Sequence, residues 1–131
     1  MLFNFSEKEK LKSEKEIKLL FSEGVSIFNH PLRVIFLFSP AEVSECKILV
    51  SVSKRYYKKA VDRNLLKRRL REAYRLNSLI LKEKLKESRF SVRIAFIYSS
   101  SKIITYKEIE KVVLTQIDYI NKKISTCEEN I

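Results

Sequence analysis

The chain has 131 residues, of which 45% are hydrophobic and 33% charged, and its formal net charge is +11. This length and composition predict one α+β domain over residues 1–131, and the positive charge indicates a polyanionic partner. No apolar run reaches the roughly 18 residues that span a bilayer, and residues 1–16 lack the apolar core of a signal peptide. We therefore expect a cytoplasmic protein.

The N-terminal half of the sequence predicts one helix followed by three strands. Ser13 and Glu16 have the spacing of a capping box, and an apolar i, i+3, i+4 stripe then predicts a short helix that ends before Gly24. Residues 25–38 are rich in β-branched and aromatic side chains and are interrupted by His30-Pro31, which predicts two strands. Residues 47–53 are expected to form the third strand.

The C-terminal half predicts a helix, a strand and a last helix. An amphipathic helix is expected from about Lys59 to residues 82–86, a fourth strand over Phe90–Tyr98, and a final helix from the Thr105/Glu108 capping box. The expected fold is a four-stranded sheet packed with helices in the order α-β-β-β-α-β-α. Residues 1–10 and 126–131 are expected to be flexible.

The segment from Lys54 to Arg75 carries most of the positive charge: ten basic residues against two acidic ones leave +8 of the chain's +11. On a helical wheel an apolar stripe covers about a third of the circumference, and it comprises Leu66, Leu70, Ala73, Tyr74, Asn77, Ile80 and Leu81. The opposite side carries Asn64, Lys67, Arg68, Arg71 and Arg75, with Arg69 on one flank and Arg63 near the start. A face with nearly one sign of charge favours RNA, because guanidinium groups bind phosphate oxygens in two-point geometry. The alternative is an ordinary solvated helix face.

The basic segment also resembles a known family. The residues that carry the resemblance are Val50-Ser51-Val52-Ser53-Lys54, Arg63-Asn64, Lys67-Arg68 and Arg71-Glu72-Ala73-Tyr74-Arg75. They are similar to the arginine-asparagine-arginine motif region of the bacterial ribonuclease P protein subunit, and the order of elements is similar from end to end. Two positions depart from the family: the turn at Tyr56–Lys59 has no glycine, and Leu65 stands where the motif usually has its second arginine. The resemblance implies a left-handed crossover through the motif helix, whereas the general rule predicts a right-handed one.

The resemblance implies a protein that assists a catalytic RNA. A single histidine excludes a paired-histidine ribonuclease, and the sequence has no Ser/His/Asp set or acidic metal cluster, so we expect no catalytic residue. In ribonuclease P the RNA subunit holds Mg²⁺ and cleaves precursor tRNA to give the mature 5′ end, so no cofactor is expected on the protein alone. The implied contacts with ribonuclease P RNA are Lys54, Arg55, Arg63, Asn64, Lys67, Arg68, Arg71 and Arg75.

The family also has a groove between its first helix and the open face of the sheet, which receives the single-stranded 5′ leader of precursor tRNA. Aromatic platforms with nearby cations hold single strands. The candidates are Phe21 on the first helix and Phe36 on the second strand, with Ser51 beside them.

Three other classes of function stay open as alternatives. A plain RNA-binding module, such as a ribosomal protein or an RNA chaperone, would show the same basic helix without a ribozyme partner. A DNA-binding helix-turn-helix is disfavoured because strands precede the basic helix. A membrane-surface role is disfavoured because the apolar face is needed to cover the sheet. Cys46 and Cys127 have no CxxC spacing and are expected to be plain thiols.

Overall fold

The computed structural model describes residues 9–129. Its elements are α1 (Glu14–Glu23), β1 (Val25–Asn29), β2 (Leu32–Pro40), β3 (Cys46–Val52), α2 (Ala60–Asn77), α3 (Leu79–Glu87), β4 (Phe90–Tyr98) and α4 (Tyr106–Glu129). The predicted α+β class and the four-stranded sheet are confirmed. The one difference in element order is that two helices, α2 and α3, stand where one long helix was expected.

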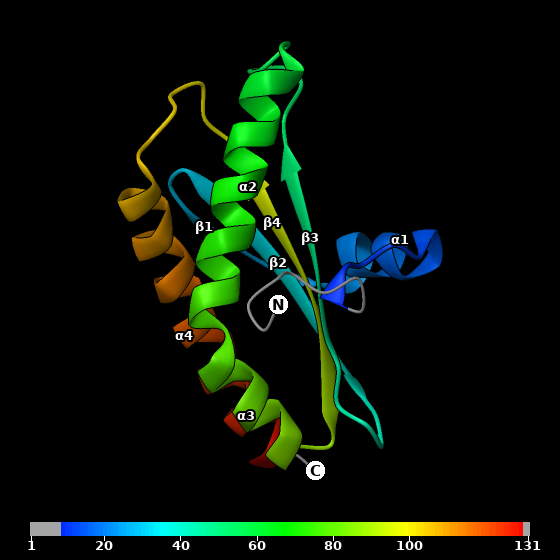
Figure 1. Cartoon of the computed structure of the whole chain (residues 1–131). Helices are drawn as coiled ribbons and strands as arrows, with labels where there is room; N and C mark the ends of the chain where they lie inside the picture. Colours follow the sequence, from blue (N-terminus) through cyan, green and yellow to red (C-terminus); the bar gives the residue numbers. More distant parts are fainter. Residues whose placement is uncertain (1–8, 130–131) are drawn as a thin grey trace.

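The four strands form one mixed sheet in the order β1-β2-β4-β3. β1 pairs antiparallel with β2, and β2 pairs antiparallel with β4, whereas β3 and β4 are parallel. In Figure 1, β3 and β4 both rise, α2 lies in front of them, and β4 lies to the left of β3. The crossover from β3 through α2 and α3 to β4 is therefore left-handed, as the family resemblance implied.

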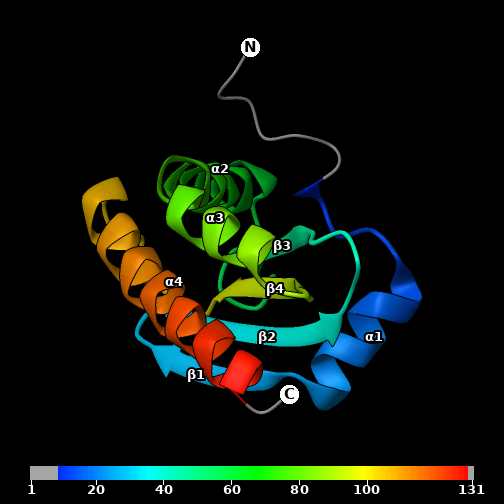
Figure 2. The same ribbon diagram turned by 90° about the horizontal axis from the view of Figure 1, so that it is seen from below.

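The sheet separates two helical layers of unequal size. Figure 2 shows α2, α3 and α4 on one face of the sheet and α1 alone on the other. The larger core lies on the α2–α4 face and includes alternate residues of β2, β3 and β4. The smaller core lies under α1, where Leu20 packs with Leu11, Ile35 and Ala95. Because α1 is short, it covers only part of its face, and this leaves sheet surface for other contacts.

The first helix begins and ends as its sequence predicts. The Ser13 side chain accepts a hydrogen bond of 3.3 Å from the backbone N–H of Glu16, which satisfies one free donor of the first turn. Gly24 ends the helix at a close approach, because a Cβ built on it would lie 2.4 Å from the Leu20 carbonyl oxygen and 2.7 Å from Ile35 Cγ2. This close approach lets β1 start immediately beside β2.

The long helix expected from Lys59 is interrupted at Ser78, which separates α2 from α3. The Asn77 side chain donates hydrogen bonds to the Ala73 carbonyl oxygen at 2.8 Å and to Glu110 Oε2 of α4 at 3.0 Å. Beyond the interruption Leu81 is fully buried, as predicted, but Ile80 is 67% exposed, so its predicted burial is wrong. The helical period read along α2 does not continue unchanged into α3.

The structure describes part of the two end segments that were expected to be flexible. Lys10 forms a parallel bridge with Ile48, and the Leu11 N–H donates to the Ile48 carbonyl oxygen at 2.8 Å, so this segment borders β3. α4 extends to Glu129 and so includes part of the C-terminal segment that was expected to be flexible. The remaining positions expected to be flexible, residues 1–8 and 130–131, lie outside the described part of the chain. No helix within residues 9–129 is long and apolar enough to cross a membrane.

Candidate RNA interface on α2 and the sheet

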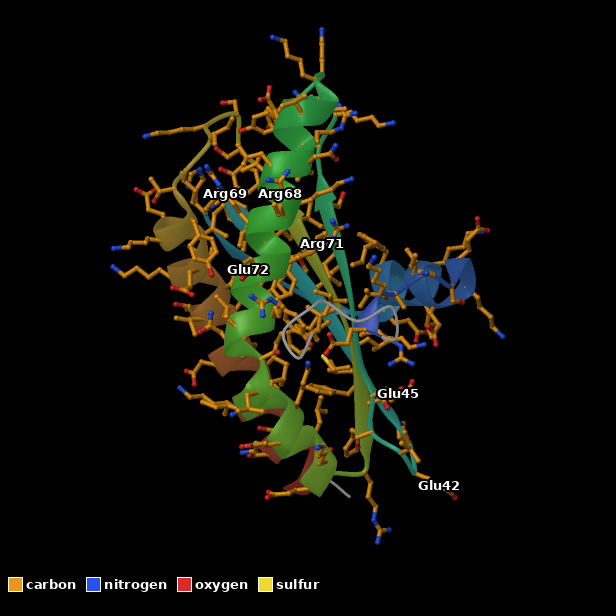
Figure 3. All side chains as sticks on the ribbon, in the orientation of Figure 1. Glu42, Glu45, Arg68, Arg69, Arg71 and Glu72 are labelled. Atoms are coloured by element: carbon orange, nitrogen blue, oxygen red, sulfur yellow. The ribbon has the colours of Figure 1, made fainter. Side chains whose placement is uncertain are left out.

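The two faces of α2 differ as the helical wheel predicted. Leu66, Leu70, Ala73 and Tyr74 are fully buried against the sheet and α4. On the outer side Asn64 and Arg68 are exposed, and Lys67 and Arg71 are half-buried. Figure 3 shows Arg68 on the outward side of α2, with Arg69 and Arg71 on its two flanks. The apolar stripe fixes the helix to the sheet and leaves the cations on the other side facing outward.

The cations at the centre of this outer face are Lys67, Arg68 and Arg71. Among the side chains that the structure describes, no carboxylate forms an ion pair with Lys67, Arg68 or Arg71. Arg71 lines a shallow cleft with Lys10, Lys12 and the backbone of β3, which brings further positive charge to the same side of the sheet. Cations grouped in this way favour binding of a polyanion by counterion release.

Arg63, by contrast, is partly engaged within the protein. Its Nη1 donates to the carbonyl oxygens of Tyr57 at 2.7 Å and Lys58 at 2.9 Å. These bonds close the turn between β3 and α2, and the Tyr57 side chain anchors the turn because it is 95% removed from solvent. Within the described chain no residue, in this turn or elsewhere, has a positive φ. The turn at Tyr56–Lys59 therefore does not need the glycine that other family members often have there.

Arg75 is held in an ion pair with Glu72. Its Nε donates to Glu72 Oε2 at 3.0 Å, and its Nη2 contacts Oε1 of the same carboxylate. The hydrogen bond from Arg75 lowers the pKa of Glu72, because it stabilises the carboxylate more than partial burial opposes it. Arg75 is therefore a less available cation than Arg68, and its predicted contact with RNA stays a prediction.

Lys54 and Arg55 extend the positive surface beyond the end of β3. Both side chains are exposed, and the Arg55 guanidinium lies 5.9 Å from the centre of the Tyr56 ring. The Arg55 N–H donates to Ser53 Oγ at 3.1 Å, which shapes the start of the turn. Arg69 is directed elsewhere: its Nη1 donates to the Ile104 carbonyl oxygen at 2.7 Å, so it joins α2 to the segment before α4.

Of the three residues assigned to the leader groove, Phe21 and Ser51 are accessible to solvent and Phe36 is buried. Phe21 of α1 is 47% exposed. Ser51 is half-buried and lies two residues after Leu49, which packs on the smaller core, so Ser51 is on the α1 face of β3. The expected position of Phe36 in this groove is wrong. It is 2% exposed and belongs to the larger core, where its ring lies 6.1 Å from that of Tyr119 of α4. Because Phe36 faces away from α1, it cannot line a groove beneath that helix.

Residues of β2 that do face α1 were missed by reading the sequence alone. They are Arg33, Ile35 and Leu37, which alternate with the buried residues of the larger core. The pairing of β1 with β2 places Phe28 directly opposite Arg33 on the same face. The position of the His30-Pro31 turn could have identified these residues, because it sets the register of the β1–β2 hairpin.

Cys46, at the start of β3, packs against the larger core. Its Sγ lies 3.0 Å from Tyr74 Oη, and burial raises the pKa of the thiol to about 11. Among the side chains that the structure describes, no group of three His, Cys, Asp or Glu could hold a metal ion.

The chain is thus a small basic α+β protein with a left-handed βαβ crossover and a cationic outer face on α2. A family model described as Ribonuclease P matches residues 5–118. The chain is 38% identical to a ribonuclease P protein component of Porphyromonas gingivalis, over 83% of this chain and 80% of the relative. It is 34% identical to the one of Clostridioides difficile, over 82% of this chain and 88% of that relative. The chain belongs to the ribonuclease P protein family.

Solved structures agree with this assignment at the level of the fold. A mutant RNase P protein of Staphylococcus aureus superimposes with a TM-score of 0.66 at 23% identity, covering 87% of this chain and 88% of the other. The RNase P protein of Thermotoga maritima gives a TM-score of 0.54 at 23% identity, covering 94% and 97%. The overall chain path is therefore that of the family.

Proposed function

We propose that this chain, a ribonuclease P protein component, binds the RNA subunit through the outer face of α2 and the 5′ leader of precursor tRNA through the sheet face beside α1. Ribonuclease P is the endoribonuclease that forms the mature 5′ end of tRNA. The observation that carries the proposal is that α2 buries Leu66, Leu70 and Tyr74 while Arg68, Arg71 and Lys67 form no ion pair with any described carboxylate.

The contacts that we assign to the RNA subunit differ in kind. Arg68, Arg71 and Lys67 are proposed to neutralise phosphates, and Asn64 to hydrogen-bond a sugar or a base edge. Lys54 and Arg55 are proposed to continue this surface at the end of β3. These cations reduce the repulsion between two RNAs that must approach each other, an effect that matters most when little salt or Mg²⁺ is present.

Arg63 and Arg75 are proposed to contact RNA from positions that the protein already constrains. Arg63 retains donors beyond the Nη1 that closes the turn, because a guanidinium has five N–H groups. Arg75 would reach RNA while paired with Glu72 or after leaving it. The Mg²⁺ ions of the reaction are proposed to be held by the RNA subunit, and the protein residues act by binding and orientation.

The leader surface is proposed to lie on the sheet face beside α1. Phe21 of α1 has an exposed ring and Ser51 of β3 a half-buried hydroxyl, and both are assigned to this surface. An aromatic face stacks on any base, so such a surface accepts leaders of different sequence. We therefore expect the protein to recognise a precursor by its single-stranded extension and not by particular bases.

Reconstitution tests the proposed function. The purified chain is mixed with a bacterial ribonuclease P RNA at low magnesium, and cleavage of precursor tRNA is followed. We expect stimulation by the native chain and loss of most of it when Lys67, Arg68 and Arg71 are replaced by alanine. The matched control replaces Lys86, Lys122 and Lys123, three exposed lysines outside α2, and should retain stimulation. Absence of stimulation by the native chain would refute the proposal.

A further inference from the structure

An exposed aromatic ring and an arginine stack on each other at the edge of the sheet. Phe28 of β1 is 46% exposed, and the Arg33 guanidinium of β2 lies 5.2 Å from the centre of its ring. Arg33 Nη1 also donates to Ser26 Oγ at 2.9 Å, which holds the guanidinium in place. The His30 ring lies 6.3 Å from that of Phe28 in an edge-on arrangement. The pair is thus ordered and open to solvent.

The strand register places this pair in line with the proposed leader surface. Phe28 is opposite Arg33, Arg33 is opposite Ile97 of β4, and Ile97 is opposite Ser51 of β3. Ile97 packs on the α1 core, which confirms that the row lies on the α1 face. The row crosses the whole sheet, and adjacent strands are about 4.8 Å apart, so Phe28 and Ser51 are separated by about 14 Å.

The chemistry of the row suits a single-stranded nucleic acid. An aromatic face stacks on a base, a neighbouring guanidinium binds a phosphate or stacks in turn, and a hydroxyl donates to a sugar or base. The row itself contains no acidic residue. Two carboxylates close to this face, those of Glu16 and Glu45, form ion pairs with Arg93 of β4. The charge of the surface therefore complements a phosphate backbone.

We propose that Phe28 and Arg33 form a second stacking platform for the 5′ leader, at the opposite side of the sheet from Ser51. This inference rests on the proposed function of the α1 face and extends it by two residues on the β1–β2 hairpin. A leader that enters beside Ser51 crosses β4 and β2 before it reaches Phe28. Nucleotides close to the cleavage site then contact Ser51, and nucleotides further upstream contact Phe28 and Arg33.

A fluorescence experiment tests the platform in the protein alone. The chain contains no tryptophan, so Phe28→Trp introduces a single reporter at the platform. A single-stranded oligouridylate should quench this tryptophan, and Arg33→Gln in the same background should weaken the binding by several-fold. The matched control is Val25→Trp, which lies on β1 with 50% exposure and faces the other side of the sheet, opposite Phe36. Equal quenching in both variants, or none in Phe28→Trp, would overturn the proposal.

A second experiment uses the reconstituted holoenzyme and precursor tRNAs with a series of leader lengths. Phe28→Ala should weaken binding of long-leader substrates by roughly tenfold, the size expected for one stacked base, and should leave the shortest leader unaffected. Phe28→Tyr should restore the affinity. If Phe28→Ala weakens all leader lengths equally, or none, the platform does not exist. Failure of the native chain to stimulate cleavage would instead refute the proposed function, and the fluorescence result does not depend on it.

Discussion

Replacing Arg68 by alanine removes one exposed cation from the centre of the α2 outer face without touching the core. A cation that neutralises one phosphate contributes about 0.9 to the slope of log affinity against log salt on duplex nucleic acid. The variant should therefore bind the RNA subunit more weakly at low salt, and its slope should be shallower by about 0.9. A fourfold rise in salt then costs the variant about 3.5-fold less affinity than it costs the native chain.

Leu70→Ala, two positions along the same helix, is the matched control. Leu70 is fully buried, so its truncation should destabilise the fold by about 2 to 5 kcal/mol and lower Tm by roughly 10 °C. Arg68→Ala should change stability by less than about 0.5 kcal/mol. The salt slope of folded Leu70→Ala should equal that of the native chain, because its cations are unchanged.

Two measurements on each variant decide the question: binding titrations at several salt concentrations, and thermal unfolding followed by circular dichroism. If Arg68→Ala lowers Tm as far as Leu70→Ala does, Arg68 is structural and the assignment of the two faces is wrong. An unchanged salt slope in Arg68→Ala would show that this arginine does not contact a phosphate.

Three further changes test other features of the structure. Glu72→Gln removes one negative charge beside the cations of α2, so it should tighten RNA binding and steepen the salt slope by up to about one unit in the same titration; an unchanged slope would contradict this. Cys46 should alkylate slowly in the folded chain at pH 7, and about tenfold faster per pH unit toward its pKa of about 11, as site-resolved mass spectrometry can measure; rapid labelling at pH 7 would show that the thiol is not buried. Gly24→Ala should destabilise the fold by about 1 to 3 kcal/mol in thermal or denaturant unfolding, because its Cβ would lie 2.4 Å from the Leu20 carbonyl oxygen; native stability would show that the backbone relaxes there.

The sequence predicted the faces of α2 well because that helix has a polar and an apolar side along its whole length. Leu66, Leu70 and Tyr74 are buried as the helical period requires. The interruption at Ser78 was not predictable in the same way. It coincides with the hydrogen bond from Asn77 to Glu110, a residue of α4 that comes 33 positions later in the chain. Local periodicity contains no information about such a contact.

The misassignment of Phe36 has a different physical cause. From Val34 to Phe38 the side chains of β2 are apolar on both faces of the sheet, so alternation there gives no sign of which side a residue faces. The side is fixed by pairing: Phe36 is opposite Val25 and Ile94, and it points toward α4. Arg33 was the polar residue in this strand that marked the other face.

The turn that Arg63 closes has a mechanical consequence. Arg63, in the first turn of α2, donates hydrogen bonds to the carbonyl oxygens of Tyr57 and Lys58, so it restricts motion between the sheet and the helix. If the RNA subunit binds α2 as proposed, the sheet would move with it as one rigid body. The protein would then fix the distance between a bound 5′ leader and the scissile bond.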